Sequence, residues 1–482
     1  MLQPNISPRT IETNRNNKNS RSQDKKIWPL FSNFSVPERN EKRSEIICPM
    51  QIQLARPRAI KGTLLGPREV NNSWRDGNPD INDQESFHRA ISPILAVAQI
   101  FALLPVLNIR NPSPAKLCFK RISIRTFYTT AVIVMLFFMT YTAFIHMITT
   151  LRAETFVQDG GIATATGGIM FYGNSLMGTV LFFRLAPKWI ALQREWRMME
   201  RFFNSCKYPQ VRLRWKFMLI TAMIMIPAAL EHTLSVVKAI PDSSEFPYNN
   251  GTWREYVEIY TDRSHAFTYT TVKFSTALGI FYFIISKIAT FTWNFTDLFV
   301  ILVSTGLAER YKHLNQVVLT GGKSDCSNLD WRQLREQYAA LSSLVKHADN
   351  VVSPIILLSF TNNLYFICLQ LLNGLSPKGT SIIMTLYFFA SFAFLIGRTV
   401  SVTLLTARIN DQSKLALPAI YSCPASCFTN ETQRLQLQLT SDEVVMTGLK
   451  FFSITRNFML AVAGAILTYE VVLLQFNVAM AK

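Results

Sequence analysis

Two adjacent ionisable residues, Glu231 and His232, interrupt an otherwise uncharged apolar run at positions 217–237. Ionisable groups inside such a run are costly and usually have a function. A carboxylate beside an imidazole offers hydrogen-bond donors and acceptors, so the pair predicts contact with a polar ligand. The alternative is structural, with Glu231 paired to Lys273 or both residues bonding neighbouring helices together.

No catalytic constellation accompanies this pair. The six histidines are scattered, and the sequence has no H-E-x-x-H, G-x-S-x-G or glycine-rich phosphate-binding motif. We therefore expect a protein that is not an enzyme, with no catalytic residues, no cofactor and no metal site. A receptor, channel or transporter is the expected class.

Seven long apolar segments position these residues. They cover 126–151, 160–183, 217–237, 266–296, 350–377, 379–407 and 457–481. A helix needs about 20 mostly apolar residues to cross a bilayer core, and buried helices of soluble proteins rarely reach that length. The sequence therefore predicts an all-α fold with seven transmembrane helices.

The basic residues of the loops predict the orientation of these helices. The net charge of the chain is +18, and the loop 184–216 carries nine basic and two acidic residues, whereas 238–265 carries three basic and five acidic ones. Basic loops face the cytoplasm. The N-terminus is therefore expected inside and the C-terminus outside, which is inverted relative to a G-protein-coupled receptor. Asn250, in the sequon Asn250-Gly251-Thr252 of an outer loop, is predicted to be glycosylated.

The predicted organisation has seven parts. They are a disordered cytoplasmic tail (1–86), a cytoplasmic or interfacial helix with a basic linker (87–125), transmembrane helices 1–4 (126–296), a cytoplasmic helical anchor region (297–349), transmembrane helices 5–6 (350–408), a cytoplasmic amphipathic half of helix 7 (409–451) and its membrane half (452–482). Pro93 and Pro105 are expected to bracket the short helix of the second part.

The last apolar segment carries a recognisable pattern. Thr468-Tyr469 is followed, after five intervening residues, by Gln475-Phe476. This pattern resembles the C-terminal signature of the insect gustatory receptor family, and Glu470 after Thr-Tyr is similar to the sugar (sweet taste) receptor branch. Further stretches that resemble this branch are Phe87-His88-Arg89-Ala90, Trp293-Asn294 with Asp297-Leu298-Phe299, Asn362-Asn363-Leu364-Tyr365-Phe366, Gln370-Leu371-Leu372-Asn373 and Leu395-Ile396-Gly397-Arg398-Thr399.

The resemblance implies a ligand-gated cation channel, similar to the insect odorant receptor channels, with the last helix of each of four subunits lining a pore. The spacing of that helix agrees, because Val472, Gln475, Phe476 and Ala479 share one face, with Thr468 one turn earlier. A ring of Phe can gate by dewetting and Gln can rehydrate an ion. The alternative is that Gln475 bonds to a neighbouring helix within the bundle.

The resemblance also implies a sugar ligand in an outward-facing pocket. A sugar needs convergent donors and acceptors beside an aromatic surface. The outer halves of the predicted spans supply the candidates, which are Tyr141, His146, Glu231, His232, Tyr269, Lys273, Asn363, Gln370 and Tyr387.

The expected function is a sugar-gated, non-selective cation channel that acts as a gustatory receptor in the plasma membrane of chemosensory neurons. Its expected partners are sugar, membrane lipid, permeant cations and related subunits in a homotetramer or heterotetramer, but not nucleic acid. Two alternatives are a metabotropic seven-helix chemoreceptor, which needs an outside N-terminus, and a secondary transporter of a small polar solute, which should show an internal repeat of spans.

Overall fold

The computed structural model describes residues 85–151, 161–204, 212–240, 252–324, 329–374 and 382–480. All of them belong to one compact unit, Gly77–Lys482. Nearly all of the predicted N-terminal tail and the predicted glycosylation site Asn250 lie outside the described residues.

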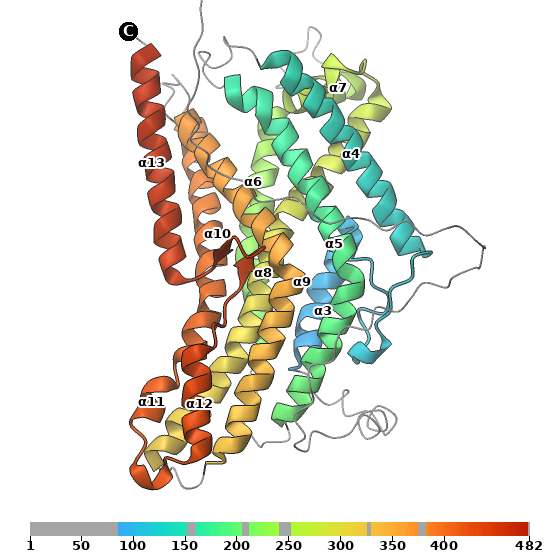
Figure 1. Ribbon diagram of the computed structural model, residues 1–482. Helices are drawn as coiled ribbons and strands as arrows, with labels where there is room; N and C mark the ends of the chain where they lie inside the picture. Colours follow the sequence, from blue (N-terminus) through green and yellow to red (C-terminus); the bar gives the residue numbers. More distant parts are fainter. Residues whose placement is uncertain are drawn as a thin grey trace, which may run out of the picture. The chain divides into compact units, whose positions relative to one another are not determined.

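The described chain consists mainly of helices joined by loops, with two short strands (Figure 1). The helices are α3 (Phe87–Ala98), α4 (Ile124–Thr150), α5 (Gly161–Asn204), α6 (Leu213–Ala239), α7 (Trp253–His265), α8 (Thr276–Ser324), α9 (Trp331–Gly374), α10 (Ile382–Lys414), α11 (Leu417–Tyr421), α12 (Asn430–Ser441) and α13 (Arg456–Met480). Strands β1 (Thr447–Gly448) and β2 (Phe452–Ser453) form an antiparallel pair between α12 and α13. The predicted all-α class is confirmed.

Six helices of the described chain are long and apolar enough to cross a membrane, namely α4, α5, α6, α8, α9 and α10. The 25-residue helix α13 coincides with the seventh apolar segment of the sequence, 457–481. Helices α5, α8 and α9 are far longer than a bilayer requires, with 44, 49 and 44 residues. Their extra turns continue beyond the apolar part and pack against one another there (Figure 1).

The start of the fourth predicted span is wrong. The sequence places it at residue 266, but α8 begins at Thr276, after a 3₁₀ turn at Ala266–Thr270 and a non-helical stretch to Ser275. The 3₁₀ turn folds onto the bundle, where the Phe267 ring lies 5.8 Å from that of Tyr172. An apolar run of this kind is compatible with either a buried turn or a helix, so periodicity alone does not separate them.

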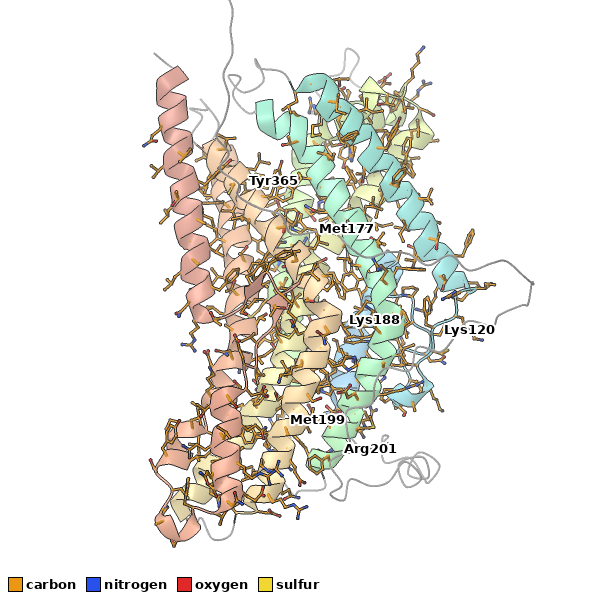
Figure 2. All side chains as sticks on the ribbon, viewed as in Figure 1. Lys120, Met177, Lys188, Met199, Arg201 and Tyr365 are labelled. Carbon is orange, nitrogen blue, oxygen red and sulfur yellow. The ribbon has the colours of Figure 1, made fainter. Side chains whose placement is uncertain are left out.

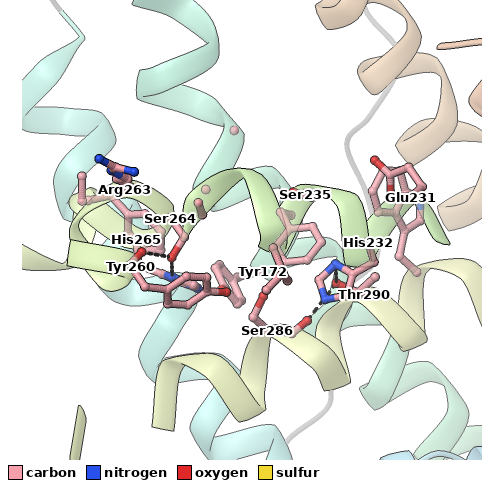
Figure 3. Close-up of a pocket in the computed structure, with 18 of the residues that line it drawn as sticks. Tyr172, Glu231, His232, Ser235, Tyr260, Arg263, Ser264, His265, Ser286 and Thr290 are labelled. Atoms are coloured by element: carbon pink, nitrogen blue, oxygen red, sulfur yellow. Dashed lines mark hydrogen bonds between the residues drawn. The ribbon is translucent and has the colours of Figure 1, made fainter. Parts of the chain in front are cut away.

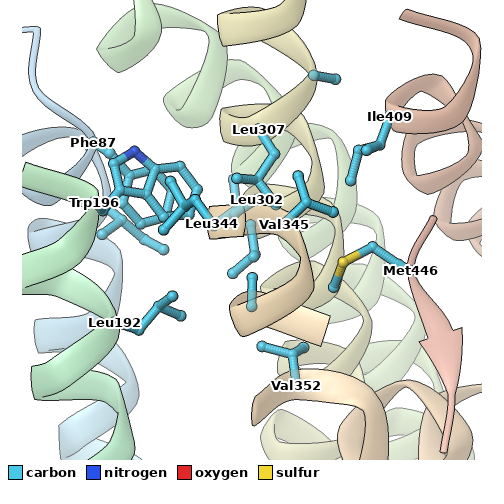
Figure 4. Packing of buried hydrophobic residues seen from close by; sticks show 14 of the residues in the cluster. Phe87, Leu192, Trp196, Leu302, Leu307, Leu344, Val345, Val352, Ile409 and Met446 are labelled. Atoms are coloured by element: carbon cyan, nitrogen blue, oxygen red, sulfur yellow. The ribbon is translucent and has the colours of Figure 1, made fainter. Parts of the chain in front are cut away.

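Helix α3 packs into the bundle. Ser86 caps its first turn, and Phe87 stacks on Trp196 of α5 with ring centroids 3.6 Å apart (Figure 4). Gly306 of α8 makes room for this pair, because a Cβ there would lie 2.7 Å from the Phe87 ring. Pro93, expected at the edge of the helix, lies inside it.

The extended ends of α8 and α9 carry the segment that leads to α13. Asp349 of α9 accepts hydrogen bonds from the Thr447 amide at 2.6 Å and the Lys450 ammonium at 2.5 Å, which fixes the β1–β2 hairpin. Lys346 forms an ion pair with Asp442, just after α12. Burial alone would raise the pKa of Asp442, but the bonds from Lys346 and Ser342 lower it, so the carboxylate stays ionised.

Candidate ligand-binding site

A cavity of about 720 Å³ opens between α4, α5, α6, α7 and α8. This volume lies within the range of small-molecule sites in proteins, about 300–1,000 Å³. Figure 3 shows side chains of α7 at one end of the cavity, Glu231 and His232 of α6 at the other, and Tyr172 of α5 between them. The lining therefore brings together residues that are far apart in the sequence.

Glu231 accepts hydrogen bonds from two hydroxyl groups of α10. Tyr387 Oη lies 3.2 Å and Ser391 Oγ lies 3.1 Å from the same carboxylate oxygen, Oε1. Gln370 of α9 extends the network, with its amide nitrogen 3.3 Å from Ser391 Oγ. Both of these bonds use Oε1, and each carboxylate oxygen can accept more than one hydrogen bond, so Glu231 can also accept from a ligand in the cavity.

His232 is held by α8. The Lys287 ammonium lies 2.7 Å from His232 Nε2, and Thr290 Oγ1 lies 3.5 Å from Nδ1. An ammonium can only donate, so Nε2 is the acceptor and the proton of the neutral ring sits on Nδ1. The Lys287 ammonium also lies over the Phe283 ring, 4.3 Å from its centroid.

His265 at the end of α7 joins the cavity wall to α5. Its Nε2 lies 2.9 Å from Tyr172 Oη, and its Nδ1 lies 2.6 Å from Ser264 Oγ. Burial, with the charge of Lys287 nearby, lowers the pKa of His265 to about 4. The imidazole is therefore neutral at pH 7, so it can use one nitrogen as a donor and the other as an acceptor.

Aromatic rings form another part of the wall. Phe171 and Trp293 line the cavity with ring centroids 6.1 Å apart, and Trp293 stacks on Phe366 of α9 at 4.6 Å. Stacking restricts the Trp293 rotamer, so the cavity has a fixed apolar surface in addition to its polar groups.

One helical turn along α8 from Trp293, a buried ion pair crosses the bundle. Arg398 Nε of α10 lies 2.7 Å from Asp297 Oδ2 of α8, and both side chains are at most 2 % exposed. Asn363 of α9 donates to Asp297 at 3.0 Å and accepts from Arg398 at 3.0 Å. The Arg398 guanidinium also lies 4.7 Å from the Trp293 ring, so this cluster and the cavity share one side chain.

The structure distributes the nine candidate ligand residues over several places. His146, Glu231 and His232 line the cavity, while Gln370 and Tyr387 reach it through the Glu231 network. The other four lie elsewhere, with Asn363 in the ion-pair cluster, Tyr141 exposed on α4, and Tyr269 and Lys273 in the segment before α8.

The sequence did not predict several residues that line the cavity, because 238–265 was interpreted as a loop. It contains α7, which contributes Tyr260, Ser264 and His265 to the cavity. Thr252 and Glu255 form a capping box at its start, and that S/T-x-x-E spacing is a helix signal readable from sequence. The signal would have suggested a helix over the outer ends of the spans.

Helix α13 lies at an edge of the bundle beside α9 and α10 (Figure 1). Val472 is 41 % exposed, and Thr468 and Gln475 are exposed as well. Thr468 Oγ1 bonds back to the carbonyl of Gly464 at 2.9 Å. The side chains of Phe476 and Ala479 lie outside the described part of the structure.

The sequence is similar to known receptors over most of its length. It matches the family described as trehalose receptor over residues 35–481. It is 33 % identical over 425 residues to the gustatory receptor for sugar taste 64f of Drosophila melanogaster, covering 86 % of this chain and 87 % of that one. It is 32 % identical over 423 residues to the gustatory receptor 5a for trehalose of the same organism, covering 87 % and 91 %.

The fold is similar to that of solved insect receptors. The olfactory receptor OR5 from Machilis hrabei matches with a TM-score of 0.59 at 14 % identity, over 80 % of this chain and 97 % of that one. The same receptor in complex with eugenol matches with a TM-score of 0.56. With six long apolar helices and its similarity to the trehalose receptor family and to gustatory receptors, the chain is a multi-pass membrane protein.

Proposed function

This chain belongs to the trehalose receptor family, and on that premise we propose that it is a sugar-gated, non-selective cation channel. It acts as a gustatory receptor in the plasma membrane of chemosensory neurons. Relatives named for sugar taste and for trehalose support the ligand class. A receptor of this kind needs no catalytic group.

The cavity is the observation that carries the proposal. A sugar ring has hydroxyls around its edge and apolar C–H faces, so it fits a site with polar groups on one side and a flat ring on another. Glu231 and His232 supply the polar side, and Trp293 supplies the flat surface. The volume of about 720 Å³ leaves room for a disaccharide as well as for a monosaccharide.

The pore is assigned to α13 in a homotetramer or a heterotetramer with related subunits. Thr468, Val472 and Gln475 are exposed in the single chain, as expected of side chains that face a central axis. Phe476 is the proposed gate and Ala479 the residue one turn beyond it. In this arrangement the N-terminus is cytoplasmic, the C-terminus and Asn250 are outside, and Asn250 is glycosylated.

A physical route joins the cavity to α13. Trp293 lines the cavity and contacts Arg398, which ties α10 to α8 and α9. Helices α9 and α10 both pack against α13. A sugar that moves the Trp293 ring would shift the Arg398 cluster, so ligand binding would favour one of two arrangements of the pore helix.

Whole-cell current from this chain expressed alone tests the proposal, with a panel of monosaccharides and disaccharides applied outside. We expect Glu231→Gln and His232→Ala to abolish sugar currents while surface expression persists. Thr149→Ala is a matched control, because Thr149 is exposed on α4 and its hydroxyl bonds to carbonyls of its own helix. Robust sugar currents in both pocket variants would refute the assignment of the cavity.

The pore assignment has its own test. Phe476→Ala should raise the basal current, because a smaller side chain cannot exclude water from a narrow pore. Unchanged basal and sugar-evoked currents would count against a gate at this position. Current in excised patches without nucleotides separates a channel from a coupled metabotropic receptor.

A further inference from the structure

The linker between α3 and α4 and the first turn of α4 expose both basic and apolar side chains. Residues 109–125 contain five Lys or Arg and no acidic residue. Ile122, Ile124 and Phe127 at the start of α4 are 97 %, 89 % and 77 % exposed. Single exposed apolar residues are common, but a group of them beside a basic cluster is typical of a surface that meets both lipid headgroups and acyl chains.

The linker holds this surface in a fixed shape. Leu107 and Cys118 form an antiparallel bridge that closes the loop between them. Asn108, in the left-handed region with φ of 63°, donates its side-chain amide to the carbonyl of Lys116 at 3.0 Å. Basic side chains on a closed loop of this kind bind a ligand with less loss of backbone entropy than they would on a flexible tail.

The basic residues before α4 are also anchored. Thr126 Oγ1 donates to the carbonyl of Lys120 at 2.7 Å, and Ser123 Oγ accepts from the Thr126 amide at 3.2 Å as the N-cap of α4. Lys120 and Arg121 are therefore held at the helix N-terminus, where the helix dipole adds a positive potential. Both side chains are exposed.

Helix α5 brings two more cations to the same place. The Phe119 ring of the linker packs edge-on against Phe183 of α5 at 6.0 Å. Arg184 and Lys188, next along α5, are exposed. Figure 2 shows Lys120 on the linker and Lys188 on α5 at a similar level along the bundle.

We propose that this linker surface, residues 109–127 with Arg184 and Lys188, binds the phosphorylated headgroup of an anionic phospholipid in the inner leaflet. The inference rests on the inverted orientation of the proposed function, which puts the linker on the cytoplasmic side, where anionic lipids are enriched. A free phosphate compound would neutralise the charges, but Ile124 and Phe127 belong to α4, a helix apolar enough to cross a membrane, so the basic cluster lies at the level of lipid headgroups. The exposed apolar side chains therefore favour a lipid.

Native mass spectrometry of the full-length protein tests this inference, with phosphatidylcholine and phosphatidylinositol bisphosphate supplied in equal amounts. A basic residue near a membrane surface contributes about 1 kcal/mol, or about a fivefold change in affinity. The variant K116Q/K120Q/R121Q should therefore retain on the order of 100-fold less phosphatidylinositol bisphosphate. The matched control K312Q/R332Q/K414Q removes three exposed charges from the extended ends of α8, α9 and α10 and should retain the lipid normally.

Two further measurements distinguish a lipid headgroup from a free phosphate compound. I124S/F127S should lower lipid retention severalfold, and soluble inositol trisphosphate should displace the lipid poorly. Equal lipid retention in the triple variant and its control would overturn the site. Full retention by I124S/F127S, or displacement by inositol trisphosphate at the lipid's own concentration, would overturn the lipid assignment.

The lipid measurement uses neither sugar nor current, so it fails independently of the proposed function. Loss of the lipid site with intact sugar currents removes only this inference. Specific lipid retention without any sugar-evoked current removes only the proposed channel.

Discussion

Two groups of polar side chains share the bundle, and they differ in where their polar atoms point. In the cavity, Glu231 and His232 border about 720 Å³ of open space. The pocket beside Asp297 has a volume of only about 10 Å³, and Asp297 and Arg398 form an ion pair that Asn363 bridges. The polar atoms of the first group border open space, whereas those of the second group form a tightly packed, buried ion-pair cluster.

Burial makes the second group structural. A buried carboxylate is tolerated only when its charge is paired and its lone pairs are used. Asp297 meets this condition with Arg398, Asn363 and Ser359, the last at 2.5 Å. Because these residues come from α8, α9 and α10, the cluster fixes these three helices to one another.

Breaking the ion pair should have the largest effect. Arg398→Leu leaves the Asp297 carboxylate buried without its partner, and removing one side of such a pair costs about 3–5 kcal/mol. We expect a lower thermal unfolding midpoint for the purified full-length protein and less of it at the cell surface. The unfolding midpoint is the direct measurement.

The control for this prediction removes both charges. Asp297→Asn combined with Arg398→Leu leaves no unpaired charge, so it should recover much of the loss. If the single variant is as stable as this double variant, the ion pair is not what holds the three helices.

Filling the cavity should have a smaller effect, confined to large ligands. Gly167 of α5 lines the cavity, and a Cβ added there would meet no atom within 4 Å. Gly167→Leu should therefore occupy space without a clash. We expect the concentration of disaccharide for half-maximal current to rise about tenfold or more, a difference of about 1.4 kcal/mol, with a weaker effect on monosaccharides.

Gly397→Leu on α10 is the matched substitution, since its added Cβ also has open space and it does not line the cavity. It should leave the order of sugar preference unchanged. Equal losses for monosaccharides and disaccharides in Gly167→Leu would argue against a ligand in this cavity.

The sequence predicts the polar residues of the cavity better than it predicts the buried ion-pair cluster. Glu231 and His232 stand out because they interrupt an apolar run, and the structure places both at the cavity. Asp297 also interrupts apolar sequence, but it was placed at the edge of a cytoplasmic region. Its partner Arg398 is 101 positions away on α10, and pairing over that distance depends on how α8 and α10 pack, which periodicity does not encode.

The helices show the same limit of prediction from sequence. Long uncharged runs predict helices that cross a membrane, because composition and length decide that property. The wall formed by α7 depends on a short polar helix whose overall composition is that of a loop. His265 of this helix joins the cavity wall through its contact with Tyr172 of α5. No local sequence pattern indicates that contact.

Acidification of the outside solution should have the smallest effect, and it acts on the cavity through His265. Burial lowers the pKa of this imidazole to about 4 from its ordinary 6.5, so the unfolded chain binds the proton more readily than the folded one. Stability from this residue is therefore present above pH 6.5 and is lost as the pH falls through 4. Protonation also removes the acceptor nitrogen from the ring between Ser264 and Tyr172.

Sugar-evoked current measured against outside pH gives the sign of this effect. We expect a constant response from pH 8 to about 6 and a decline toward pH 4, while His265→Gln, which cannot gain the proton, should flatten the decline. Tyr172→Phe removes a hydrogen bond of about 1 kcal/mol and should weaken the response severalfold at every pH without abolishing the acid limb. A decline that is unchanged in His265→Gln would move the proton-sensitive group away from α7, and the cavity would then depend on acid through another residue of its wall.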